Sequence, residues 1–180
     1  MNWKILSSEY LSKHVYFTAR RDRCAMPDGT IVDPYFVVEM PTSVCAMAVT
    51  KNNEVILVQQ YRHPVQQVLL EVPGGFVDEG ESSDTAIARE LLEETGYAFS
   101  DFHFVGRIAA NPGVLENFTD LYLATGGKKT ASQQLDYNEE IEIKLVPLEE
   151  ARQLLMNNEI KQALHATCMF YAFHKLDSLK

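Results

Sequence analysis

Two apolar runs separated by a short polar turn constrain the fold of this chain more than any other feature. Residues 44–50 (VCAMAVT) and 55–61 (VILVQQY) flank the turn KNNE, a pattern that predicts a β-hairpin. The apolar residues are largely continuous and do not alternate with polar ones, which is typical of strands buried on both faces of a sheet. We therefore expect this hairpin to lie in the interior of the molecule.

Strands and helices are mixed along the rest of the chain. A second hairpin is expected from strands at 14–26 and 31–40, around the turn PDG. Shorter apolar runs predict strands at 68–72, 102–109, 119–125 and 140–146. Residues 124–130 (ATGGKKT) do not satisfy the P-loop pattern and are expected to form a turn. Helices are expected between Ser83, the predicted N-cap, and Gly96, and over 148–158 and 160–176. This mixture points to an α/β or α+β sandwich.

Composition and charge exclude several classes of protein. At 180 residues the chain has the length of one ordinary domain with a small appendage. Its formal net charge of −9 argues against a nucleic-acid partner, which would require a basic surface. No apolar run approaches the roughly 18 residues that span a membrane, and the N-terminus lacks the features of a signal peptide. The three cysteines are far apart among apolar neighbours, so we expect buried thiols in a reducing cytoplasm.

The helix that is expected to end at Gly96 carries negative charge at its least favourable end. Glu90, Glu93 and Glu94 lie in its last two turns, where the helix macrodipole disfavours carboxylates. Glu90 and Glu94 also form a like-charge i,i+4 pair, which costs about a few tenths of a kcal/mol. A solvated charged face is the ordinary interpretation of such a helix, but only Arg89 lies among these acids as a counter-charge. A divalent cation would relieve both penalties, because Mg²⁺ prefers carboxylate oxygens and bridges to phosphates.

The loop before this helix supports the same interpretation. Gly74 and Gly75 follow a strand and allow close approach of the backbone, and the turn VDEGES returns the chain into the helix. A carbonyl group of this loop is therefore expected beside the acidic face. Together, Gly75, Glu81 and the run 89–97 (RELLEETGY) resemble the 23-residue Nudix box in both residue type and spacing.

The resemblance implies a fold and an activity. It implies an α/β fold, a Nudix-type α/β/α sandwich with a mixed sheet, over residues 43–180. Residues 1–42 resemble the N-terminal β-hairpin extension through which members of this group form homodimers. Nudix enzymes hydrolyse a nucleoside diphosphate linked to another group, with Mg²⁺ or Mn²⁺ as cofactor, and we expect such a small molecule as the substrate.

The resemblance also implies roles for individual residues. Glu90 and Glu94 would be the main metal ligands, the Gly74 carbonyl a further ligand, and Glu93 another ligand or a proton acceptor. Arg89 would orient neighbouring carboxylates such as Glu81 or Glu93. Related enzymes also draw a catalytic carboxylate from the loop before the last strand. Here that loop is QQLDYNEEIEI, and the candidates in it are Glu139 and then Glu140.

Residues outside the box favour one branch of the family. The strand end QYR, the sequence LLEVPGG and Pro112, sixteen residues beyond Gly96, resemble ADP-ribose pyrophosphatases and nucleoside diphosphate sugar hydrolases. By this resemblance Arg62 would contact a phosphate and Glu71 a ribose or terminal sugar; a surface salt bridge and a structural acid are the alternatives. Tyr35 and Phe36 would stack on a base, or belong to a core or interface.

Two classes of function remain open. One is a metal-dependent hydrolase of ADP-ribose or related nucleoside diphosphate sugars, which releases a nucleoside monophosphate and a sugar phosphate. The other is a Nudix-fold sensor that binds a nucleotide without catalysis. A hydrolase with another substrate, such as a dinucleoside polyphosphate, coenzyme A or a nucleoside triphosphate, keeps the chemistry of the first class. The complete set of acids favours an enzyme.

Overall fold

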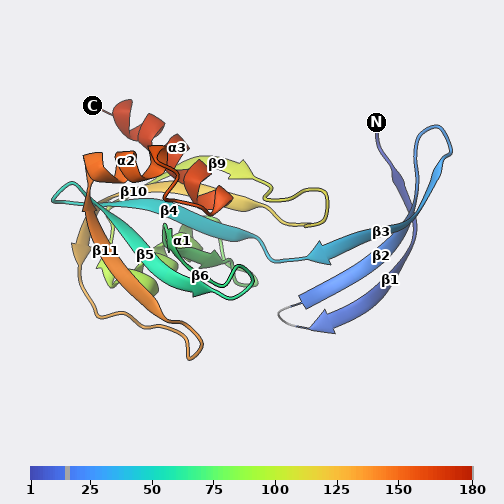
Figure 1. Ribbon diagram of the computed structural model, residues 1–180, viewed down its shortest axis with the longest axis horizontal. Helices are drawn as coiled ribbons and strands as arrows, with labels where there is room; N and C mark the ends of the chain where they lie inside the picture. The colour runs from blue at the N-terminus through green and yellow to red at the C-terminus, as the bar shows by residue number, and fades with distance from the viewer. Residues whose placement is uncertain (15–16, 180) are drawn as a thin grey trace. The chain divides into compact units, whose positions relative to one another are not determined.

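The computed structural model describes residues 1–14 and 17–179, and the chain divides into two compact units (Figure 1). The first unit comprises residues 1–41 and 109–118, and the second comprises residues 42–108 and 119–180. The segment 109–118 was assigned to the second domain from the sequence. It belongs to the first unit because it pairs with strand β3, where Val38 N donates to Val114 O at 2.8 Å and Glu116 N to Val38 O at 3.0 Å.

The first unit is built on an antiparallel sheet in the order β1-β2-β3. Its strands are β1 (Lys4–His14), β2 (Phe17–Ala25) and β3 (Ile31–Glu39). The hairpin of β2 and β3 was predicted, although residues 15 and 16 of the predicted strand lie outside the described residues. Strand β1 was not predicted. Its pairing with β2 is irregular near Ile5 and Tyr10, and ten of its eleven residues are exposed, so its sequence lacks the regular alternation of a half-buried strand.

The second unit is built on a mixed sheet flanked by helices. Its strands are β4 (Ser43–Thr50), β5 (Glu54–Arg62), β6 (Gln67–Glu71), β7 (Gly74–Phe76), β8 (Tyr97–Ala98), β9 (Asp101–Ile108), β10 (Thr119–Lys129) and β11 (Ile141–Pro147). Strands β11, β5, β4, β10 and β8 are neighbours in that order, while β6, β7 and β9 pair with β5, β4 and β10. The pair β4–β10 is parallel, and the other named pairs of this sheet are antiparallel.

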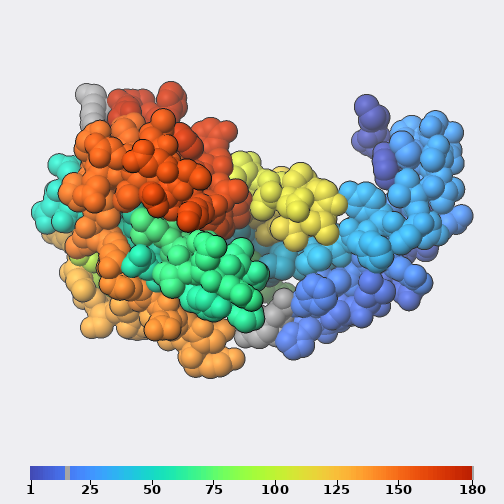
Figure 2. Space-filling view, in the orientation of Figure 1, coloured from blue at the N-terminus to red at the C-terminus, as the bar shows by residue number. Residues whose placement is uncertain are grey.

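Strand β4 divides the core of the second unit into two layers. Cys45, Met47 and Val49 face the layer that contains α2 (Leu148–Met156) and α3 (Ala163–Asp177). Their neighbours Val44, Ala46 and Ala48 face the layer that contains α1 (Ser83–Thr95). Because successive side chains of a strand point to opposite faces, the continuous apolar sequence covers both. Helices therefore cover both faces of the sheet, and the expected α/β/α sandwich is confirmed. Figure 2 shows α2 and α3 forming one continuous surface.

Two local predictions were wrong. Residues 124–130 do not form a turn, because β10 continues to Lys129 through an irregularity between Ala124 and Gly127. Gly126 has a φ of +74° there, so the glycine permits the irregularity without ending the strand. The N-cap of α1 is Ser82 and not Ser83, since the Ser82 hydroxyl accepts a hydrogen bond from Thr85 N at 3.3 Å.

The buried cysteines that the sequence predicted are confirmed. Cys24, Cys45 and Cys168 are free and buried. None of the described helices has the length and hydropathy required to cross a lipid bilayer.

Candidate active site

An open cavity of about 540 Å³ lies in the second unit, where β7 meets the C-terminal half of α1. Strand β5 and the loop between β10 and β11 complete its walls. The cavity brings together six residues that were predicted as metal ligands, catalytic groups or substrate contacts: Arg62, Gly74, Glu90, Glu93, Glu94 and Glu139. We call it the acidic cavity.

Two glycines let β7 fit between β4 and α1. A Cβ atom on Gly74 would collide with the carbonyl oxygen of Val44 and the backbone of Cys45. A Cβ atom on Gly75 would collide with the carboxylate of Glu90. The two hydrogens in place of side chains therefore set how closely the loop backbone approaches the acids of α1.

Glu94 differs from an ordinary surface acid in its environment. A solvated charged face was the ordinary interpretation of this helix, but Glu94 is only 7% exposed. Its carboxylate accepts a hydrogen bond from Gly74 N at 3.0 Å. The pKa of Glu94 is raised from 4.5 to about 8, chiefly by burial and further by the charges of Glu90 and Glu139. The Gly74 N–H group and the charge of Arg62 act in the opposite direction and offset only part of this rise.

Arg89 gathers the acids on its side of the cavity, as predicted. Its guanidinium contacts carboxylate oxygens of Glu81 at 2.9 Å, Glu90 at 2.9 Å and Glu93 at 3.1 Å. It also donates to the carbonyl of Phe76 at 3.1 Å, which ties the loop to the helix. Burial raises the pKa of Glu90 even with Arg89 beside it. Arg89 thus offsets part of the negative charge of Glu81, Glu90 and Glu93.

The oxygen donors of this cavity fit a hard divalent cation. Glu90 and Glu94 offer carboxylate oxygens, and Gly74 offers a backbone carbonyl on the loop that approaches them. Among the described residues, no three His, Cys, Asp or Glu side chains converge closely enough to hold a metal ion by themselves. Arg89 contacts Oε1 of Glu90 and Oε2 of Glu93, and each carboxylate has a second oxygen that could bind a cation.

Glu71 lies outside the cavity lining. Its side chain is 1% exposed, and Arg62 donates to it from Nε at 3.1 Å and from Nη2 at 2.5 Å. His165 on α3 places Nδ1 3.6 Å from the same carboxylate, and burial lowers the pKa of this histidine to about 4. In this position Glu71 holds Arg62 at the edge of the cavity. A direct contact of Glu71 with a sugar stays a prediction.

Sequence reasoning missed other residues that line the cavity. Gln60 on β5 and Gln134 and Asp136 in the loop before β11 also line it. Gln60 and Arg62 are two residues apart on β5, so their side chains point to the same face of the sheet. This spacing could have identified Gln60 as a cavity residue. Glu139 accepts a hydrogen bond from Asp136 N at 3.1 Å, whereas Glu140 is exposed and does not line the cavity.

Comparison with known proteins tests the resemblance over the whole chain. The NUDIX domain family matches residues 40–167, which is more than half of the chain. The chain belongs to the Nudix hydrolase family. The nucleoside diphosphate sugar hydrolase N-terminal domain family matches residues 3–38.

Three bacterial proteins are among the relatives of this Nudix enzyme. An ADP-ribose pyrophosphatase of Mycobacterium tuberculosis is 32% identical over 91% of this chain and 79% of its own length. An ADP-ribose pyrophosphatase of Bacillus subtilis is 30% identical over 75% of this chain and 74% of its own. A methanol dehydrogenase activator of Bacillus methanolicus is 33% identical over 69% and 68%. The crystal structure of an ADP compounds hydrolase has the same fold, with a TM-score of 0.87 over 99% of this chain and 96% of that one, at 21% identity.

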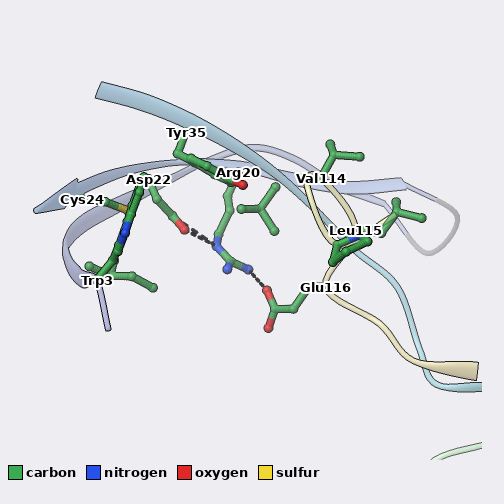
Figure 3. Close-up of a pocket in the computed structure, with 11 residues that line it drawn as sticks. Trp3, Arg20, Asp22, Cys24, Tyr35, Val114, Leu115 and Glu116 are labelled. Atoms are coloured by element: carbon green, nitrogen blue, oxygen red, sulfur yellow. Dashed lines mark hydrogen bonds and ion pairs between the residues drawn. The ribbon is translucent and has the colours of Figure 1, made fainter. Parts of the chain in front are cut away.

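The N-terminal unit of the Nudix enzyme contains a cavity of its own, of about 390 Å³. Its apolar wall includes Trp3 and Tyr35, whose rings meet edge to face at 6.1 Å between centroids. Figure 3 shows Arg20 extending between Asp22 and Glu116 at one side of this cavity. Arg20 Nε lies 3.1 Å from Asp22, and Nη1 pairs with Glu116 as well as with Glu39. Aromatic and charged groups therefore meet in one pocket.

Proposed function

We propose that this Nudix enzyme hydrolyses the diphosphate of ADP-ribose or a related nucleoside diphosphate sugar, with Mg²⁺ or Mn²⁺ as cofactor. The observation that carries the proposal is the meeting of opposite charges in the acidic cavity. Arg62 offers a cation for a phosphate, while Glu90 and Glu94 offer ligands for a divalent ion that would neutralise the diphosphate. The names of two relatives, both ADP-ribose pyrophosphatases, support the same substrate class.

The residues of the cavity divide the chemistry between them. The bound cation would polarise a phosphoryl oxygen and lower the pKa of a water molecule. Arg62 orients the diphosphate, and Glu71 holds Arg62 in place. Glu93 or Glu139 accepts the proton of the attacking water. The water oxygen bonds to one phosphorus, the bond from that phosphorus to the bridging oxygen breaks, and the bridging oxygen leaves with the other phosphate.

The first prediction concerns the substrate. ADP-ribose or another nucleoside diphosphate sugar should yield a nucleoside monophosphate and a sugar phosphate only when Mg²⁺ or Mn²⁺ is present. The measurement is product analysis across a panel that also contains dinucleoside polyphosphates, coenzyme A and nucleoside triphosphates. Turnover of one of these three alone would redirect the substrate assignment. No turnover of any compound with either metal would leave the nucleotide sensor as the better account.

The N-terminal unit supplies the proposed dimer contact. Its sheet exposes several large apolar side chains, with exposures from 41% to 56%: Ile5, Leu6, Tyr10, Leu11, Phe17 and Phe36. A small sheet with so much exposed apolar surface needs a covering partner. We propose a second copy of this chain as that partner, and Tyr35 as a residue that stacks on the base of the substrate.

The free, buried thiols support a reducing, cytoplasmic location, and the net charge of −9 supports the absence of nucleic-acid partners.

The second prediction concerns this assembly. Light scattering at micromolar concentration should give about twice the mass of one chain. Replacing Leu11 and Phe17 with serine should shift the mass toward one chain, because both side chains belong to the apolar surface. Replacing the exposed Leu145 of β11 with serine is a matched control outside the first unit and should leave the mass unchanged. A wild-type monomer with full activity would rule out the dimer.

A further inference from the structure

The C-terminal end of α1 is bound by the segment 130–134. A helix leaves its last carbonyl groups without partners inside the helix. Here Gly96 O accepts hydrogen bonds from Thr130 N and Ala131 N, at 2.9 and 3.1 Å, and Glu93 O accepts one from Gln134 N at 2.8 Å. The carbonyl of Glu94 is bound by a side chain: Gln133 Nε2 donates to it at 2.7 Å.

The same amide nitrogen of Gln133 reaches the other end of the loop. It donates a second hydrogen bond to Ile141 O at 3.2 Å. Ile141 is the first residue of β11, is buried, and pairs with Gln60 across the sheet. An amide group carries two N–H donors, so one side chain can hold both carbonyls at once. Gln133 therefore closes the loop 134–140 by joining its two ends to α1 and β11.

The loop closed by Gln133 carries residues that line the acidic cavity. Gln134, Asp136 and Glu139 are among the lining residues, whereas Gln133 is not. Within the loop, Glu139 N donates to Asp136 O at 3.0 Å, and the Glu139 carboxylate accepts from Asp136 N at 3.1 Å. These two bonds fix Glu139 relative to its own loop. The position of the loop relative to Glu90 and Glu94 depends on its ends.

We propose that Gln133 is a positioning residue, which holds the Glu139 loop in register with the acidic end of α1. Its amide joins the carbonyl of Glu94 to the start of β11 and so sets where Glu139 stands in the acidic cavity. Gln133 acts through the loop and does not touch the substrate. The inference rests on the proposed function for the importance of Glu139, but the closure of the loop is a property of the chain alone.

Hydrogen exchange of the substrate-free protein tests the closure without any activity. Gln133→Met keeps the length of the side chain but has no N–H donor, and Gln133→Ala removes the side chain. In both variants the backbone amide of Gln134, which anchors the start of the loop to Glu93 O, should exchange faster than in the wild type. Ser132→Ala, in the adjacent exposed position, is the matched control and should leave exchange unchanged. Unchanged protection in both Gln133 variants would overturn the proposal.

Kinetics of the Glu139 variants test whether the closure serves the reaction. Gln133→Met should lower kcat by about 10- to 100-fold with little change in KM, since a small displacement of a catalytic group costs this much. In a Glu139→Gln background the same change should cause no further loss, because Gln133 affects the reaction only by positioning Glu139. If Gln133→Met lowers kcat equally in the wild type and in Glu139→Gln, the positioning role is overturned. An unchanged kcat in Glu139→Gln alone would also overturn it. If the wild type cleaves none of the panel, the proposed function fails alone, and hydrogen exchange still decides the role of Gln133.

Discussion

Glu94→Gln should abolish most of the activity and yet leave the metal-free protein at least as stable as the wild type. The loss of a cation ligand should lower kcat/KM by about 10²- to 10⁴-fold, because the metal contributes several kcal/mol to the transition state. The stabilisation against thermal unfolding that Mg²⁺ confers should shrink as well, since a ligand that binds the folded state less tightly stabilises it less. Activity assays and thermal melts with and without Mg²⁺ measure both effects.

The pKa of Glu94 determines whether Glu94→Gln stabilises or destabilises the metal-free protein at a given pH. The pKa of Glu94 is about 8 in the folded protein and 4.5 in the unfolded chain. Between these values the folded state binds a proton that the unfolded state does not, so the stability of the wild type falls as the pH rises through this range. Glu94→Gln removes that titration and should be more stable above pH 8, by an amount on the order of a few kcal/mol.

A matched variant separates this effect from a general change of charge. Glu150→Gln, on the exposed first turn of α2, changes the net charge equally and should keep activity, the Mg²⁺ response and the pH dependence. A Glu94→Gln enzyme that is active and responds fully to Mg²⁺ would contradict the assignment of Glu94 as a metal ligand.

Gly75→Ala should inactivate the enzyme without unfolding it. The added Cβ would meet the carboxylate of Glu90, which is the far end of a flexible side chain and can move. Movement of this ligand should lower kcat/KM by about 10²-fold while the free energy of unfolding changes by roughly 1 kcal/mol or less. Activity assays combined with urea unfolding measure the two quantities.

The neighbouring glycine provides the contrast. In Gly74→Ala the Cβ would meet the backbone of Val44 and Cys45, which cannot move without distorting β4, so this variant should lose several kcal/mol of stability. At Gly80 a Cβ meets nothing within 4 Å, and Gly80→Ala should keep activity despite a strained φ of +81°. Full activity of Gly75→Ala would contradict the close approach between the loop and Glu90.

The sequence predicted the parts of the site that are local in the chain. The spacing of Glu90 and Glu94 and the glycine loop follow from short stretches whose geometry is set by one helix and one turn, and the family resemblance implied the role of Arg89. The burial of Glu94 was missed because the sequence of a helix contains no information about β7, whose Gly74 N–H group binds the Glu94 carboxylate. The loop residues Gln134 and Asp136 were missed for a similar reason, since only long-range contacts bring them to the cavity.

The sequence left the function of Arg62 and Glu71 open. A substrate contact and a structural ion pair both require an arginine and a glutamate, so residue type alone does not separate them. The structure pairs them across β5 and β6, and the burial of Glu71 shows which side of the pair faces the core. The fold itself was more predictable, since the continuous apolar sequence of β4 requires cover on both faces. The irregularity in β10 was not predictable, because two adjacent glycines are equally typical of a turn.

The face of β4 that packs on α1 carries small side chains. Ala46 and Ala48 lie on this face, and Ala86 of the helix belongs to the same buried cluster. Small volumes on both surfaces let the helix lie close to the sheet, and this spacing fixes how far the acids of α1 stand from the glycine loop. A gain of one methyl group in this buried layer would move α1 away from the sheet and change the shape of the acidic cavity. In the proposed enzyme, residues that no substrate reaches would therefore influence catalysis through the thickness of the layer they fill.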